Sequence, residues 1–174
     1  MIYVKEFTTK FGDLILGDFE GKLCLCDWKY RKMRSTIDNR LKKGFGCDYM
    51  YQESDLLVEA ERQLKEYFVG VRSKFELPLT TVGTDFQKSI WNLLLEIPYG
   101  ETVSYRELAS KLNNPKAVRA VASANGANSI SIFIPCHRVI GSDGSLTGYA
   151  GGLNSKLMLL KLESSYKGGN LFGR

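Results

Sequence analysis

Histidine is almost absent from this chain: a single one, His137, occurs in 174 residues. Any chemistry that needs an imidazole therefore depends on one position. No apolar run approaches the roughly 18 residues that a membrane-spanning helix needs. The first residues, MIYVKEFTTK, have neither the charged start nor the long apolar stretch of a secretory signal. We expect no membrane association and a cytoplasmic location, or a nuclear one in a eukaryote.

Cysteine is also scarce, with four residues, and we expect reduced thiols. Cys24 and Cys26 lie one residue apart in KLCLCDW, whereas paired zinc ligands usually have about two to four residues between them. Cys47 would have to be the third ligand and His137 the fourth. Strand alternation puts Cys24 and Cys26 on one face, which favours buried packing. We predict no metal site and no cofactor.

The net charge of +5 is unevenly distributed along the chain. Residues 84–174 hold ten Lys and Arg against six Asp and Glu, whereas residues 1–83 hold fourteen against thirteen. A surface that binds nucleic acid would therefore belong to the second half. A solvated basic face without a partner is the alternative.

The first half has the pattern of a small α+β domain. IYVKEF, DLILGDF and KLCLCDW resemble strands, and Glu20-Gly21-Lys22 predicts a hairpin turn between the last two. Residues 31–53 are polar and contain glycine, which predicts a loop with little regular structure. SDLLVEAERQLKEYFVG predicts a helix that is capped at Ser54 or Asp55 and ends at Gly70. KFELPL then predicts an extended segment.

The second half is marked by helix-start signals. Thr84 with Gln87 forms a capping box at the start of TDFQKSIWNLLLEI, and Ser104 with Glu107 forms another at the start of SYRELASKL. Asn113-Asn114-Pro115 predicts an Asn cap and a first-turn proline for the helix PKAVRAVASANG. Two short helices joined by a brief turn predict a helix-turn-helix.

These patterns divide the chain into two domains. We expect an N-terminal α+β domain over residues 1–79, a linker over residues 80–83 and a mostly helical domain over residues 84–174. The helix-turn-helix is expected over residues 104–125.

The second helix of this motif lacks the side chains that read bases. Direct readout in the major groove uses Arg, Asn or Gln. The exposed face is expected to consist of Ala117, Arg119, Ala120 and Ala124, and the core face of Val118, Val121 and Ala122. Small side chains let a helix approach the minor groove, which is about 6 Å wide and carries little sequence information. We expect DNA binding without strong sequence preference; a helix packed inside the protein is the alternative.

Residues 129–141 read SISIFIPCHRVIG. Ser131 to Ile134 alternate and predict a short buried strand that ends at Pro135, so that Cys136 occupies the first irregular position. A thiol beside the one side chain that titrates near neutral pH is typical of nucleophilic chemistry. A buried, inert cysteine is the alternative.

The segment IPCHRVIGSDGSLTGYAGGLNSKLMLLKLE resembles the active-site block of the O6-alkylguanine-DNA alkyltransferases, the methylated-DNA–protein-cysteine methyltransferases. The preceding FQKSIWNLLLEIPYGETVSYRELASKLNNPKAVRAVASANGANSISIF resembles their helix-turn-helix segment. The resemblance covers residues 84–163, and the first half agrees in type with the family's small ribonuclease-H-like α/β domain. It implies an α+β monomer that binds double-stranded DNA through the minor groove and flips out O6-alkylguanine. The alkyl group then passes irreversibly and stoichiometrically to the protein's own cysteine.

The resemblance also implies roles for individual residues. For catalysis it implies Cys136 as acceptor, His137 as proton relay through a water, Glu163 as the carboxylate that orients His137, Tyr105 as proton donor to guanine N3, and Asn128 as the residue that shapes the active-site turn. For DNA it implies Arg119 as the side chain that replaces the flipped base, with Ser104, Tyr105, Ala117, Ala120 and Ser123 as further contacts. For the base pocket it implies Tyr149, Ala150, Val139 and Pro135.

Elementary physics adds support for two of these roles. A thiol with a pKa of about 8.5 is only slightly ionised at neutral pH, so Cys136 needs a base. Glu163 lies near the C-terminal end of helix NSKLMLLKLE, where a carboxylate opposes the helix dipole and therefore calls for a tertiary partner such as His137. In one departure from the family, Ala150 replaces the usual serine and keeps only its backbone N–H.

Three other functions use some of the same residues. A cysteine hydrolase would form a thioester and turn over, a binding module would need no acceptor cysteine, and a helix-turn-helix regulator would need a base-reading helix. The preference between methyl and bulkier groups, and between O6-guanine and O4-thymine, stays open.

Overall fold

The computed structural model describes residues 1–166 and separates them into two compact units. Unit 1 comprises Met1–Gly83 with Ser129–Phe133, and unit 2 comprises the remainder. The predicted α+β class is confirmed. The predicted domain limits stay a prediction. Ser129–Phe133, which we expected in the second domain, packs with unit 1, and residues 167–174 lie outside the described part of the chain.

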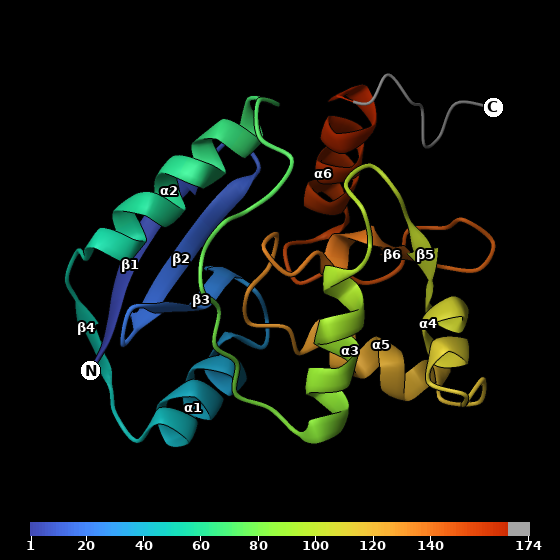
Figure 1. Cartoon of the computed structure of the whole chain (residues 1–174), viewed down its shortest axis with the longest axis horizontal. Coiled ribbons are helices and arrows are strands. Elements are labelled where there is room, and N and C mark those ends of the chain that lie inside the picture. Colours follow the sequence, from blue (N-terminus) through green and yellow to red (C-terminus); the bar gives the residue numbers. More distant parts are fainter. Residues whose placement is uncertain (167–174) are drawn as a thin grey trace. The chain divides into compact units, whose positions relative to one another are not determined.

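Unit 1 is built on a four-stranded sheet with the strand order β3-β2-β1-β4. Its strands are β1 (Ile2–Thr9), β2 (Gly12–Phe19), β3 (Lys22–Trp28) and β4 (Tyr49–Tyr51). The first three are antiparallel neighbours, and β4 runs parallel to β1 (Figure 1). Glu20 and Gly21 have φ values of 52° and 77°, which confirms the predicted hairpin, because a two-residue turn of this hand needs two positive φ angles.

Helix α1 (Arg34–Phe45) and strand β4 occupy the region of residues 31–53, so our prediction of a loop there was wrong. Ile37 and Leu41 are buried in a core cluster with residues of β1, and Phe45 packs against that cluster. These three residues are spaced four apart and form a narrow apolar stripe. The stripe suffices because the sheet supplies the other side of the core.

Helix α2 (Asp55–Phe68) is confirmed, together with both of its predicted ends. The Ser54 hydroxyl accepts a hydrogen bond from the backbone N–H of Leu57 at 3.2 Å, and Gly70 has a φ of 82°. Figure 1 shows α2 lying along the sheet of unit 1.

The segment before the cysteine-histidine pair is not the strand that we predicted. The N–H of Cys26 donates to the Ser129 carbonyl at 2.9 Å, and the N–H of Ser131 donates to the Cys26 carbonyl at 2.7 Å. Pairing stops there, because Ile132 has a φ of 74° and the N–H of Phe133 turns back to the Ser131 carbonyl. This tight turn is rare and strained for a β-branched residue.

Unit 2 contains four α-helices in its described part, together with a short 3-10 helix and a two-stranded parallel sheet. These elements are α3 (Asp85–Leu95), β5 (Val103–Ser104), α4 (Tyr105–Lys111), α5 (Val118–Gly126), η1 (Cys136–Arg138), β6 (Val139–Ile140) and α6 (Leu153–Tyr166). Both predicted capping boxes are present, at the starts of α3 and α4.

Helix α5 begins later than its sequence signals predicted. Its N-cap is Ala117, so neither an Asn cap nor a first-turn proline is used. Pro115 lies in a turn before the helix, and Asn113 has a φ of 57°.

Candidate active site and DNA-binding face

Cys136 begins the short helix η1, directly after a tight turn at Pro135. Pro135 has φ −81° and ψ 64°, and the N–H of Cys136 donates to the Ile134 carbonyl at 2.8 Å. The side-chain amide of Asn128 donates to the same carbonyl at 2.9 Å. The structure therefore brings Asn128 onto the turn that presents Cys136, which is 4% exposed.

Glu163 of α6 lies against η1 and binds two of its side chains. Its Oε2 is 2.7 Å from Nε2 of His137, and its Oε1 accepts a hydrogen bond from Nε of Arg138 at 2.8 Å. Arg138 also donates from its terminal nitrogens to Glu163 Oε2 at 3.1 Å and to the Ile97 carbonyl at 2.7 Å. All three ionisable side chains are buried. The sequence pointed to His137 as the partner of Glu163, but Arg138 was missed.

This burial and pairing set the protonation states of the cluster. Burial lowers the pKa of His137, although the nearby Glu163 opposes the change, so the ring favours its neutral form. Burial alone would raise the pKa of Glu163, but the interactions with His137 and Arg138 outweigh it and hold that pKa well below its usual range. A carboxylate can only accept, so Nε2 of His137 carries the hydrogen in the neutral ring.

The other ring nitrogen of His137 is then a free acceptor. Nδ1 is buried and has no hydrogen-bond partner among the described residues. A buried acceptor of this kind is typically satisfied by a water or by a ligand. Because Cys136 precedes His137 in η1, a proton acceptor lies next to the thiol in the chain.

Tyr105 is brought to the same region by the two short strands. Val103 of β5 pairs with Val139 of β6, directly after η1, and Ser104 is the cap that starts α4 at Tyr105. The Tyr105 hydroxyl donates to the Thr147 carbonyl at 3.2 Å. Burial, and to a smaller extent the charge of Cys136, raise the pKa of this hydroxyl, so it stays protonated at neutral pH.

Lys156 is a second residue that we missed. It lies in the first turn of α6 and its side chain is fully buried. Its ammonium donates to the carbonyls of Val139 at 2.6 Å, Thr147 at 3.0 Å and Gly148 at 3.3 Å. A signal was available: a cation at a helix N-terminus opposes the dipole, as Glu163 does at the other end of the same helix.

The exposed face of α5 differs in part from our prediction. Arg119 and Ala120 are exposed as expected, and Ser123 is exposed too. Our assignments of Ala122 and Ala124 were wrong, because Ala122 is exposed and Ala124 is buried. The helix starts at Val118 and is held to α3 by Trp91, whose indole N–H donates to the Ala124 carbonyl at 2.9 Å.

The residues assigned to the base pocket differ in burial. Pro135 and Val139 are buried, whereas Tyr149 and Ala150 are half-buried in the loop of residues 141–152. The half-buried Ala117 lies just before α5, and Ser104 caps α4. The roles of these residues in binding stay predictions.

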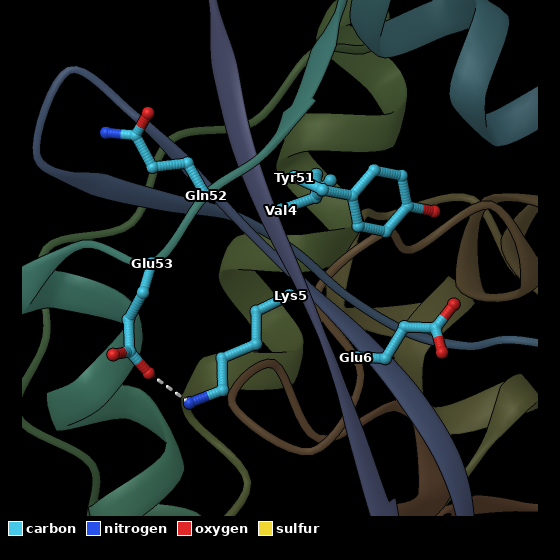
Figure 2. Close-up of a pocket in the computed structure, with 6 residues that line it drawn as sticks. All are labelled: Val4, Lys5, Glu6, Tyr51, Gln52 and Glu53. Carbon is cyan, nitrogen blue, oxygen red and sulfur yellow. Dashed lines mark hydrogen bonds and ion pairs between the residues drawn. The ribbon is translucent and has the colours of Figure 1, made fainter.

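A shallow open pocket elsewhere, in unit 1, contains none of the predicted site residues. It lies along β1 and β4, and its lining residues are Val4, Lys5, Glu6, Tyr51, Gln52 and Glu53. Figure 2 shows Lys5 pointing to Glu53, with which it forms an ion pair. Lys5 also pairs with Glu61 at 2.5 Å. The positive charge in this pocket is therefore already matched by carboxylates.

Cys24 and Cys26 are fully buried, which confirms the expected strand packing. Across residues 1–166 no three His, Cys, Asp or Glu side chains are grouped so that they could hold a metal ion. Among the same residues no helix is both long and apolar enough to cross a membrane.

The chain is similar to known proteins over most of its length. Residues 85–165 match the family model described as the DNA-binding domain of 6-O-methylguanine DNA methyltransferase. A methylated-DNA–protein-cysteine methyltransferase from Methanosarcina barkeri is 60% identical over 164 residues, which cover 94% of this chain and 98% of that protein. One from Methanosarcina acetivorans is 45% identical over 165 residues, which cover 94% of this chain and 99% of that protein.

Solved structures extend the likeness to the whole described fold. The structure of Mycobacterium tuberculosis OGT in complex with DNA superposes with a TM-score of 0.80 at 38% sequence identity, covering 94% of each chain. Identity of this level over nearly the full length, in both units, leads to one conclusion: the chain belongs to the family of the methylated-DNA–protein-cysteine methyltransferases.

Proposed function

We propose that this protein repairs DNA by moving the alkyl group of O6-alkylguanine onto Cys136, once and irreversibly. The observation that carries the proposal is the buried cluster of Cys136, His137 and Glu163, in which Nδ1 of His137 remains an acceptor. Family membership supports the reaction class. The residue roles below are the proposal's own.

The chemistry requires a thiolate and a leaving group. The Cys136 thiol passes its proton through a water to Nδ1 of His137, and Glu163 steadies the resulting imidazolium through Nε2. The thiolate sulfur attacks the alkyl carbon, and the bond from that carbon to guanine O6 breaks. Tyr105, which is protonated and held at its hydroxyl, donates a proton to guanine N3 so that a neutral base leaves.

The product explains why the protein acts once. The alkyl carbon ends in a thioether, which water does not hydrolyse at neutral pH, so Cys136 is not regenerated. A cysteine hydrolase would form a thioester at the same atom and turn over.

For DNA binding we assign the exposed face of α5 to the minor groove. Ala120, Ala122 and Ser123 are small and exposed, so the helix backbone can approach the groove closely. Arg119 is the long cation on this face and fills the stack when the damaged base leaves it. Ser104 and Ala117 lie at the starts of the two helices of the motif. We propose that the protein binds duplex DNA as a monomer, in the cytoplasm.

The base pocket is assigned to the loop of residues 141–152 and to the residues that flank η1. Tyr149 forms one wall, and the backbone N–H of Ala150 donates to guanine O6. Pro135 and Val139 form the buried floor. The missing serine hydroxyl at Ala150 leaves the backbone N–H as the donor at that position.

Mass spectrometry after exposure to a duplex with one O6-methylguanine tests the proposal. We expect one added methyl group per molecule, located in the peptide that contains Cys136, and none in Cys136→Ala. Cys24→Ala is the matched control, since it removes a fully buried thiol of unit 1 and should leave methylation intact. Methylation at another cysteine, or repeated turnover on excess DNA, would contradict the assignment.

A further inference from the structure

We propose that Asn125 makes the base pocket specific for guanine: its side-chain carbonyl accepts a hydrogen bond from the 2-amino group of the flipped base. The inference rests on the proposed function, because it needs an O6-alkylguanine next to Cys136. Neither the sequence patterns nor the proposed chemistry gives Asn125 a role.

Asn125 is a buried side chain that joins α5 to η1. It lies in the last turn of α5 and is 6% exposed. Its side-chain Nδ2 donates to the backbone carbonyl of Cys136 at 3.4 Å. Helix α5 also packs against α4, the helix that begins at Tyr105. Asn125 therefore contacts the backbone of the nucleophile directly.

The other end of the Asn125 amide, the carbonyl oxygen Oδ1, is buried and has no hydrogen-bond partner among residues 1–166. A buried acceptor without a hydrogen bond is unfavourable, so native proteins satisfy nearly all such atoms with protein groups, water or a ligand. Nδ1 of His137 is also unpaired, but the proposed chemistry gives it a donor, the thiol of Cys136 through a water. Because the amide is planar and its Nδ2 is held by Cys136, Oδ1 is fixed in place and suited to a donor that a ligand supplies.

The substrate offers one such donor. Alkylation at O6 removes the hydrogen from N1 of guanine, so the 2-amino group is the only N–H donor that remains on the base. The amino group is bonded to the carbon next to N3, the atom to which Tyr105 donates in the proposed mechanism. Burial raises the pKa of the Tyr105 hydroxyl, and hydrogen bonding to Asn125 is the smaller of two hydrogen-bonding influences that oppose the rise. Tyr105 and Asn125 are thus suited to the neighbouring nitrogens N3 and N2 of a single base.

An acceptor of this kind discriminates against a base that lacks the amino group. O6-methylhypoxanthine has the same methyl group, reacting oxygen and ring system as O6-methylguanine but no 2-amino group. In the pocket it would leave Oδ1 buried and unpaired, and a site built to hydrogen-bond a group rejects a ligand without that group. The same base also makes one hydrogen bond fewer in its base pair, so it leaves the duplex more easily. A slower reaction of this base therefore has to arise in the pocket.

The test compares two duplexes that differ only in this amino group, one with O6-methylguanine and one with O6-methylhypoxanthine. The second-order rate constant of methyl transfer is measured for each with protein in excess, and peptide mass identifies Cys136 as the acceptor. Asn125→Leu keeps the size of the side chain, Asn125→Ala shortens it, and both remove the carbonyl. Asn92→Leu is the matched control, because Asn92 is exposed on α3. Circular dichroism checks that each variant is folded.

We expect wild type and Asn92→Leu to react at least about tenfold faster with O6-methylguanine than with O6-methylhypoxanthine. In Asn125→Leu and Asn125→Ala this ratio of rate constants should fall to about two or less, because neither variant has an acceptor to leave unpaired. The ratio is unaffected by a general loss of rate that follows from the lost contact with Cys136. A wild-type ratio near one, or an unchanged ratio in a folded Asn125 variant, overturns the proposal.

Binding separates this proposal from the proposed function. Cys136→Ala has no acceptor thiol, so its affinity for the two duplexes is measured by fluorescence anisotropy, with and without Asn125→Leu. We expect its preference for O6-methylguanine to disappear when Asn125→Leu is added. If wild type transfers no methyl group, the proposed function fails, and the ratio of affinities still decides whether Asn125 recognises the amino group. If wild type transfers the methyl group but neither ratio depends on Asn125, the proposed function stands and this proposal fails.

Discussion

Replacing Glu163 with glutamine exchanges one carboxylate oxygen for an NH2 group. That position of the buried cluster then donates hydrogen bonds where it previously accepted them. Glu163 accepts from Arg138 at 2.8 Å and 3.1 Å and lies 2.7 Å from Nε2 of His137. A glutamine side chain has one oxygen that can accept hydrogen bonds and one NH2 group that can only donate them. This NH2 group would face an N–H donor of either Arg138 or His137. One of these partners is left unpaired in a buried site.

The magnitude follows from those contacts. Breaking a buried ion pair by removing one partner costs about 3–5 kcal/mol, and a charge-assisted hydrogen bond contributes about 1.5–3 kcal/mol. We therefore expect Glu163→Gln to lose about 3 kcal/mol of unfolding free energy at pH 7. Small domains are stable by about 5–15 kcal/mol, so the variant should still fold at 25 °C.

The pH dependence of this loss has a defined sign. The pKa of Glu163 is lower in the folded protein than in the unfolded chain, where it is about 4.3. The carboxylate therefore stabilises the fold fully above pH of about 4.3, and this contribution disappears as the pH falls through the folded-state pKa. The difference between wild type and Glu163→Gln should be constant near neutrality and shrink in acid.

Activity should fall for a related reason. Without the carboxylate, neither the tautomer of His137 nor its imidazolium form is supported. We expect methyl transfer at pH 7 to slow by about 10- to 100-fold, and the rate-pH profile to move to higher pH. Urea unfolding and single-turnover rates against pH measure both effects, with Glu101→Gln as an exposed control. Superimposable pH profiles, or a stability loss no larger than that of the control, would refute the reasoning.

Three further variants test the remaining assignments. Arg119→Ala should slow repair of duplex DNA by at least about tenfold but leave the reaction with free O6-benzylguanine unchanged, because only the duplex requires base flipping. Arg106→Ala is the control, because Arg106 is exposed on α4. An equal loss of rate on both substrates would place Arg119 in the chemical step. Tyr105→Phe should reduce the rate of methyl transfer within the DNA complex by about 100-fold, since a general acid contributes about 10²–10⁴. Single-turnover kinetics at saturating DNA measure this rate, and fluorescence anisotropy measures the DNA affinity separately; an unchanged rate at saturation would remove Tyr105 from proton donation. Ser104→Ala should lower the free energy of unfolding, measured in urea, by about 1 kcal/mol, because it removes the N-cap of α4. Ser110→Ala is the control, because Ser110 lies on α4 but does not cap it. Equal losses of unfolding free energy in the two variants would mean that the cap contributes nothing.

Several features of the fold could be predicted because they depend on residues that are close in sequence. The capping boxes at Thr84 and Ser104 join residues three apart, and the hairpin at Glu20 and Gly21 needs only two positive φ angles. Such interactions are complete within one turn of chain, so the sequence displays both partners together.

Other features were missed because their partners are distant. Helix α1 has only a narrow apolar stripe, at Ile37, Leu41 and Phe45, and its core is completed by strands that the local pattern does not show. The prediction of a strand at Ser131 was wrong although the local pattern of residues was typical of a strand. Its alternation was correct, but the backbone turns at Ile132 once it has made a single bridge to Cys26.

The active site shows the same division. The sequence by itself determined that Cys136 and His137 are neighbours in the chain, and the position of Glu163 against the helix dipole called for a tertiary partner, for which it pointed to His137. Only the tertiary structure decided that Arg138 shares that carboxylate and that Lys156 binds three carbonyls. The physical reason is that every residue except proline offers the same backbone N–H and every residue the same carbonyl. Which of them a side chain meets depends on how distant segments come together in space, and no local pattern of residues records it.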